Sequence, residues 1–138
     1  MKIAIAGTGY VGLSNAILLA QHHDVTAVDV IPEKVDMVNR KESPIADAYI
    51  EDYLKNRELS LTATLDGDSA YRNAELIIIA APTNYDDVTG RFDTRAVESI
   101  LTQIRQAGSK AVVIIKSTIP IGYTKKISAR YPELSILF

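Results

Sequence analysis

Short apolar runs alternate with amphipathic helical patterns along this chain, and this alternation constrains its fold more than any other feature. Six runs have the length and composition of strands: Lys2–Ala6, Val25–Asp29, Ser60–Thr64, Glu75–Ala80, Ala111–Lys116 and Ser135–Phe138. Strands separated by helices are typical of a parallel sheet with helices on both faces. The fourth and fifth runs, "ELIIIA" and "AVVIIK", are continuously apolar, which predicts central strands buried on both faces.

The segments between these runs repeat apolar residues at the spacing of one helix face. One stripe comprises Leu13, Ala16, Ile17 and Ala20, and another comprises Val97, Ile100, Leu101 and Ile104. Asp93 is a candidate N-cap and Gly108 a candidate terminator of the second helix, while Pro32 suits the first turn of a helix reaching about Asn39. Further helices are expected around Ile50–Leu54 and over Ile121–Arg130.

This order of elements predicts an α/β fold with a doubly wound, parallel, six-stranded sheet of the Rossmann type. The expected strand order is 3-2-1-4-5-6. The length of 138 residues suits one domain, so residues 1–138 are assigned to a single Rossmann-type domain. The final run, "LSILF", is apolar and has no polar tail, so we expect the chain to be part of a longer protein.

Composition disfavours several classes of function. Fifteen basic and seventeen acidic residues give a net charge of −2 without basic clusters, which argues against a nucleic-acid surface. The apolar runs are far shorter than the roughly 20 residues of a membrane-spanning helix, and the N-terminus lacks the pattern of a secretory signal. There is no cysteine, and no His, Asp or Glu group has metal-ligand spacing. We therefore expect a cytoplasmic protein without a metal, nucleic-acid or membrane partner.

The first run leads directly into "GTGYVG", a G-x-G-x-x-G pattern that opens the first helix. The pattern alone is weak, but the strand before it, the helix after it and an acid after the second strand strengthen it. Gly7 then allows a tight turn, Gly9 lets the backbone approach a pyrophosphate, and Gly12 lets helix and strand pack closely. The N–H groups of Tyr10 and Val11 are the expected phosphate donors, aided by the helix dipole.

Asp29 ends the second run, twenty residues after Gly9. A carboxylate at this position can accept hydrogen bonds from both ribose hydroxyls of an adenosine and repels a 2′-phosphate, which favours NAD over NADP. Lys34 complicates this interpretation, because a nearby cation can weaken the repulsion or contact the ribose itself. The competing interpretation is a structural glycine turn followed by an ordinary surface aspartate.

Two polar segments, "APTNYD" and "KSTIP", follow the fourth and fifth runs, where ligands bind in open α/β sheets. Thr83 and Thr118 place hydroxyl groups next to a buried strand end, where they can face a nicotinamide ring. On spacing alone the alternative is equally good, namely that the two threonines cap turns and that the prolines beside them end the strands.

Four motifs together point to one family: "MKIAIAGTGYVGLS", "SPI" at Ser43–Ile45, "APTNYD" and "IKSTIPIGYT". They resemble the NAD-binding domain of the UDP-glucose/GDP-mannose dehydrogenase family over essentially the whole chain. "PTNYD" resembles the UDP-glucose branch more than the GDP-mannose or N-acetylmannosamine branches. Ala81 is a departure, since the family commonly has threonine there; this loses one hydroxyl and leaves Thr83 in place.

The resemblance implies a cytoplasmic enzyme that oxidises the C6 alcohol of UDP-glucose to a carboxylate with two NAD⁺. Contacts to the adenosine and pyrophosphate are implied for Gly7, Gly9, Tyr10, Val11, Gly12, Asp29 and Lys34. Positions near the nicotinamide are implied for Thr83 and Thr118. Thr118 is also expected to assist catalysis by holding a water or substrate oxygen at the reacting carbon.

The family's reaction passes through a thiohemiacetal and a thioester on a cysteine, and this chain has no cysteine. The family's catalytic cysteine, its central helix and its UDP-sugar-binding domain lie C-terminal to the segment that this chain resembles. The resemblance therefore implies a chain that binds NAD but does not catalyse alone, with UDP-glucose bound only together with that further part. The family forms homodimers largely through the central helix, so a monomer is compatible with this chain alone.

A different class of function also fits part of the sequence, namely a nucleotide-sensing module that regulates a transporter. Such modules are single Rossmann units of similar length, with a G-x-G-x-x-G start and an acid after the second strand. Length and the absence of cysteine favour this alternative, whereas "PTNYD" and "KSTIPIGYT" favour the dehydrogenase family. A third option is another sugar or hydroxyacid dehydrogenase, which shares the cofactor but not these motifs.

Overall fold

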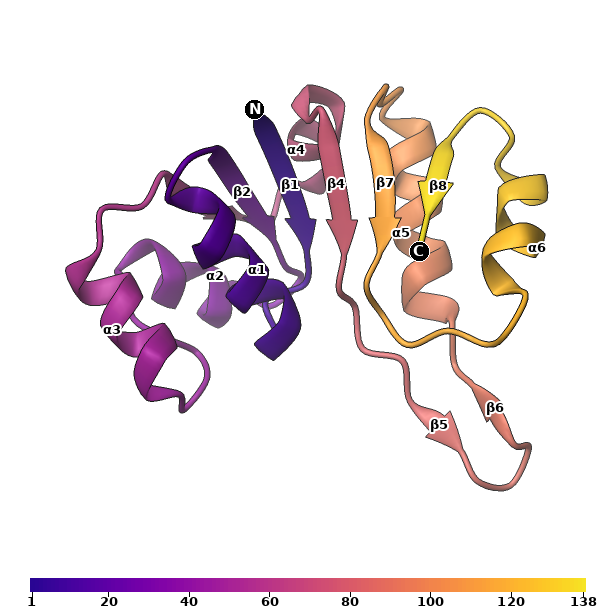
Figure 1. Cartoon of the computed structure of the whole chain (residues 1–138), viewed down its shortest axis with the longest axis horizontal. Coiled ribbons are helices and arrows are strands. Elements are labelled where there is room, and N and C mark those ends of the chain that lie inside the picture. Colours follow the sequence, from indigo (N-terminus) through magenta and orange to yellow (C-terminus); the bar gives the residue numbers. More distant parts are fainter.

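Six parallel strands form one sheet in the computed structural model, which describes residues 1–138 (Figure 1). Across the sheet they are β3 (Leu61–Thr64), β2 (Asp24–Val28), β1 (Lys2–Ala6), β4 (Leu76–Ile79), β7 (Val112–Ile115) and β8 (Ser135–Leu137). Counted along the chain without a separate two-stranded hairpin, this is the order 3-2-1-4-5-6. The predicted doubly wound α/β fold is confirmed, and the predicted strand ends lie within one residue of the observed ones.

Helices cover the sheet from two sides. One group comprises α1 (Tyr10–Ala20), α2 (Pro32–Asn39) and α3 (Ala48–Asn56), which pack with Ala27 and Ala63 of the sheet. The other group comprises α4 (Gly67–Asn73), α5 (Arg95–Gln106) and α6 (Tyr123–Arg130), which share the largest core cluster with Ile77 and Ile79. The predicted apolar stripes of α1 and α5 are the faces that the structure buries. No helix combines the length and apolar character needed to cross a membrane.

The two central apolar strands differ in how they are covered. Three consecutive residues of β4, Ile77–Ile79, are buried, as predicted for a strand with both faces covered. In β7, Val113 and Ile115 are buried, but Val112 is 39% exposed and Ile114 is only half-buried. The prediction of burial on both faces is therefore wrong for β7. The physical reason is that α1, α2 and α3 pack over β1, β2 and β3 on that side of the sheet.

Two elements are absent from the sequence-based prediction. One is α4, whose N-cap Asp66 accepts a hydrogen bond from the N–H of Ser69 at 3.2 Å. The other is a hairpin of β5 (Tyr85–Asp86) and β6 (Arg91–Phe92), which projects beyond the carboxyl ends of the sheet (Figure 1). The rings of Tyr85 and Phe92 meet edge to face across this hairpin, with 5.2 Å between their centroids.

The start of α5 also differs from the prediction. Its N-cap is Thr94 rather than Asp93. The Asp93 carboxylate still accepts a hydrogen bond from the backbone N–H of Arg95 at 3.1 Å, and it also pairs with the Arg95 guanidinium. The helix thus begins one residue later than the sequence suggested, while the acid keeps a role at its first turn.

Backbone packs directly against backbone where β1 meets α1. Gly7 has a φ of +107°, and a Cβ there would lie 2.6 Å from the carbonyl oxygen of Ala80. A Cβ on Gly12 would lie only 2.0 Å from the carbonyl oxygen of Gly7. Gly9 is different, because its φ is −73° and a Cβ would meet no atom within 4 Å. The fold therefore requires glycine at positions 7 and 12 but not at position 9.

Gly12→Ala is expected to destabilise the chain by at least about 2 kcal/mol, because the new methyl group overlaps a backbone carbonyl that cannot move without shifting β1. Gly9→Ala is the matched control and is expected to change the free energy of unfolding by less than about 1 kcal/mol. Urea unfolding followed by circular dichroism measures both values. Equal stability of the two variants would contradict this packing argument.

Candidate functional site

A cleft of about 830 Å³ opens at the carboxyl ends of β1, β2, β4 and β7. Eight of the nine predicted site residues line it: Gly7, Gly9, Tyr10, Val11, Asp29, Lys34, Thr83 and Thr118. The ninth, Gly12, lies behind the loop against the Gly7 carbonyl. Segments that are far apart in the sequence thus meet at the edge where open α/β sheets bind ligands.

The first turn of α1 presents unpaired backbone donors to this cleft. The N-cap Gly9 provides no side-chain hydrogen bond, and the first turn contains no acidic residue. The first hydrogen bond of the helix runs from the N–H of Leu13 to the carbonyl oxygen of Gly9 at 2.9 Å. The N–H groups of Tyr10, Val11 and Gly12 therefore have no acceptor within the chain. Free N–H groups at the positive end of a helix dipole suit a phosphate group.

The space at Gly9 supports the same use of the loop. Neither its backbone angles nor any neighbouring atom requires glycine, so a methyl group there would occupy only the open cleft. A pyrophosphate lying against the first turn of α1 needs this space. The loop therefore fits a dinucleotide better than it fits a purely structural turn, which would need only Gly7 and Gly12.

Asp29, directly after β2, joins the two loops that frame one end of the cleft. Its Oδ2 accepts hydrogen bonds from the N–H and Oγ1 of the fully buried Thr8 at 2.9 and 2.6 Å. Its Oδ1 accepts from the N–H groups of Val30 and Ile31 at 2.8 and 3.1 Å. Because a carboxylate offers about four acceptor sites, this one is fully engaged. A ribose at Asp29 must share the carboxylate with these donors, which the sequence spacing did not reveal.

The charge of Asp29 is stabilised by its surroundings. Partial burial raises the pKa of Asp29, but the hydrogen bonds from Thr8 and Ile31 and the nearby Lys34 ammonium group outweigh burial, so the pKa lies below its usual value. The carboxylate is therefore negatively charged at neutral pH. A negative charge at this end of the cleft disfavours a ligand that carries a phosphate there.

A hydrogen bond joins the segments that follow β4 and β7, which carry Thr83 and Thr118. Ser117 is buried, and its Oγ donates a hydrogen bond to the carbonyl oxygen of Ala81 at 2.7 Å. The hydroxyl groups of Thr83 and Thr118 make no hydrogen bond within the chain, and both residues line the cleft. Their side chains therefore do not cap turns and are free to contact a ligand.

Several residues that line the cleft were not predicted from the sequence. They come from α4, α5 and the segment after β3, and include Leu65, Tyr71, Ser99, Ile100 and Gln103. No motif marks these positions. A partial signal exists for Ser99 and Gln103, which flank the apolar stripe of α5 one turn apart. The Thr8 hydroxyl was also missed, since its partner Asp29 is 21 residues away in the sequence.

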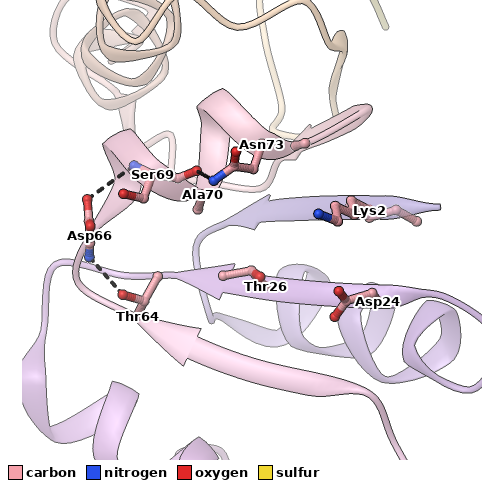
Figure 2. Close-up of a pocket in the computed structure, with 10 residues that line it drawn as sticks. Lys2, Asp24, Thr26, Thr64, Asp66, Ser69, Ala70 and Asn73 are labelled. Carbon is pink, nitrogen blue, oxygen red and sulfur yellow. Dashed lines mark hydrogen bonds between the residues drawn. The ribbon is translucent and has the colours of Figure 1, made fainter.

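A second groove, of about 410 Å³, lies between α4 and the strands β1, β2 and β3 (Figure 2). Three hydrogen bonds connect polar groups on its α4 side. The N–H of Asp66 donates to Oγ1 of Thr64 at 3.0 Å, its Oδ1 accepts from Ser69, and Nδ2 of Asn73 donates to the carbonyl oxygen of Ser69 at 2.9 Å (Figure 2). These bonds lie within α4 and the turn that leads into it.

Thr8→Val is expected to raise the pKa of Asp29, because the shortest hydrogen bond to its carboxylate is lost while the buried volume is kept. In the wild type the pKa of folded Asp29 is below the unfolded value of 3.8, so the charged carboxylate stabilises the fold above that pH and this stabilisation is lost as the pH falls further. An NMR titration of the Asp29 carboxyl carbon measures the change.

The matched control for this titration is Thr26→Val, which removes a hydroxyl outside the cleft. It is expected to leave the Asp29 titration unchanged. An Asp29 pKa that is the same in Thr8→Val and in the wild type would show that Thr8 does not hold the carboxylate.

Comparison with known proteins agrees with the site. Residues 1–134 match the model of the UDP-glucose/GDP-mannose dehydrogenase family, NAD binding domain. The UDP-glucose 6-dehydrogenases of Streptococcus pneumoniae and Campylobacter jejuni are 49% and 44% identical to this chain. Both alignments cover 100% of this chain, but only 35% and 36% of the relatives. The chain thus spans about a third of the length of these relatives.

Solved structures show the same relationship. A GDP-mannose dehydrogenase from Pseudomonas aeruginosa, determined as a ternary complex, superimposes with a TM-score of 0.85 at 29% identity over 92% of this chain and 30% of its own. A UDP-glucose dehydrogenase from Pyrobaculum islandicum gives a TM-score of 0.81 at 27% identity over 96% of this chain and 33% of its own. Because the family model matches residues 1–134, this chain belongs to the UDP-glucose/GDP-mannose dehydrogenase family and forms its NAD-binding domain.

Proposed function

We propose that the cleft binds NAD with its pyrophosphate at the start of α1, its adenosine beside Asp29 and its nicotinamide beside Thr83 and Thr118. The observation that carries this proposal is the open space at Gly9 next to the unpaired N–H groups of the first helical turn. A purely structural loop needs neither feature. The family assignment favours this proposal over the transporter-regulating module that the sequence alone left open.

The residues of this chain bind and orient the cofactor, which supplies hydride acceptance when bound. The N–H groups of Tyr10 and Val11 hold the phosphates. The charged Asp29 repels a 2′-phosphate and so selects NAD over NADP, while Lys34 reaches the ribose. The hydrogen bonds from Thr8 and Ile31, with a smaller contribution from Lys34, keep Asp29 charged. The free hydroxyl of Thr118 holds a water or substrate oxygen at the reacting carbon.

We further propose that the longer protein oxidises UDP-glucose to UDP-glucuronate. Four electrons pass from C6 to two NAD⁺, and water supplies the second carboxylate oxygen. The relatives named UDP-glucose 6-dehydrogenase support this substrate, at 49% and 44% identity against 31% for a GDP-mannose 6-dehydrogenase from Pseudomonas syringae. This chain contains no cysteine, so a thiolate step needs residues outside it. The proposal includes a cytoplasmic location, a homodimer for the longer protein, and no nucleic-acid or membrane partner.

Gly9→Ala is expected to weaken NAD binding by about tenfold or more, because its methyl group fills the space of the pyrophosphate. Isothermal titration calorimetry with the 138-residue chain measures the affinity. Thr26→Val, whose side chain lies in the other groove, is the control and is expected to bind as the wild type does. Wild-type NAD affinity in Gly9→Ala would remove the main support for this binding mode.

Thr118→Ala in the longer protein is expected to lower the turnover of UDP-glucose more than it lowers NAD affinity, since the hydroxyl acts at the reacting carbon. Steady-state kinetics and an NAD titration separate the two effects. The 138-residue chain alone is the background control and is expected to give no steady production of NADH. Loss of NAD affinity with unchanged turnover at saturation would reassign Thr118 to cofactor binding.

A further inference from the structure

Tyr71 brings a buried and unpaired hydroxyl to the cleft. It lies on α4, is 1% exposed, and packs in the main core cluster with Val28 and Ile77. It nevertheless lines the cleft, and its hydroxyl makes no hydrogen bond within the chain. Buried tyrosine hydroxyls usually have a partner, so this one calls for an acceptor that the chain does not supply.

The hydroxyl is held in its protonated, hydrogen-bond-donating form. Burial raises the pKa of Tyr71 well above its usual value, and the negative charges of Asp29 and Asp68 raise it further. Both carboxylates accept hydrogen bonds from groups other than Tyr71. Asp29 accepts four hydrogen bonds, and Asp68 Oδ1 accepts one from Gln103 Nε2 at 2.9 Å. Tyr71 is therefore a neutral donor beside the cleft, without an acceptor of its own.

The position of Tyr71 matches the adenosine end of the cleft rather than the nicotinamide end. Tyr71 shares a core cluster with Val28, the residue before Asp29, and Asp29 marks the ribose end in the proposed binding mode. Apolar side chains line the same cleft, including Ile31 and Leu65, which are 41% and 53% exposed, and Ile100 of α5. A flat purine base covers such apolar surface and carries ring nitrogens that accept hydrogen bonds, as does the attached ribose.

We propose that the Tyr71 hydroxyl donates a hydrogen bond to the adenosine half of NAD. This inference rests on the proposed placement of NAD in the cleft. Tyr71 thereby holds the adenosine half of the cofactor, which does not react, while the charge of Asp29 disfavours a 2′-phosphate. It is a binding residue that takes no part in hydride transfer.

The test is Tyr71→Phe in the 138-residue chain, which removes the hydroxyl and keeps the buried ring. Calorimetric titrations with NAD and with ADP-ribose are expected to show the same loss of affinity, about 3- to 10-fold, because both ligands contain the adenosine. The thermal midpoint is expected to stay at or above the wild-type value, since no protein partner loses a bond. Tyr123→Phe is the matched control, because Tyr123 is buried on α6 away from the cleft.

A third ligand, 2′-deoxy-NAD, identifies the acceptor. If the Tyr71→Phe loss disappears with this analogue, the ribose 2′-oxygen is the acceptor; if the loss persists, the acceptor is the base or another oxygen of the adenosine ribose. Wild-type affinity of Tyr71→Phe for both NAD and ADP-ribose overturns the inference, as does an equal loss in Tyr123→Phe. A wild-type chain that binds no NAD instead overturns the proposed function itself, so the two failures are distinguishable.

Discussion

The close approach of Gly12 to the Gly7 carbonyl is the constraint on which the site depends. A Cβ at position 12 would lie 2.0 Å from that oxygen, so only glycine lets α1 begin directly against the end of β1. The N–H of Gly7 meanwhile bonds the carbonyl oxygen of Val28 at 2.8 Å, which continues the pairing of β1 and β2 into the loop. The first turn of α1 is thereby fixed at the carboxyl edge of the sheet, with its unpaired backbone N–H groups at the cleft.

The Asp29 carboxylate is the second fixed point, and it serves the fold as well as the ligand. Through its four hydrogen bonds it connects the glycine loop to the segment that leads into α2. Its charge acts at a distance and does not require a free lone pair, so discrimination against a 2′-phosphate is compatible with a fully bonded carboxylate. Removing this side chain would therefore disturb both loops as well as the ligand.

The sequence predicted the fold class and the strand order because parallel strands require helical crossovers, and apolar runs mark the strands directly. The prediction from sequence failed where the burial of a residue or the presence of a helix depends on tertiary packing. Burial of Val112 depends on which helices lie over β7, and α4 is too short to show a helical period. The glycine motif located the loop and left Thr8 without a role, since its partner Asp29 is 21 residues away. Tyr71 reaches the cleft only through the packing of α4, which no local pattern reveals.

The structure separates groups that can supply affinity from a group that supplies selectivity. The N–H groups of Tyr10, Val11 and Gly12 and the Tyr71 hydroxyl have no partner in the chain, so a ligand that pairs with them gains hydrogen bonds without breaking any protein bond. Asp29 is already satisfied, and a ribose gains little from it because each new bond displaces an old one. In the proposed binding mode the pyrophosphate and the base therefore anchor the dinucleotide, and the proposed role of Asp29 is to select NAD over NADP.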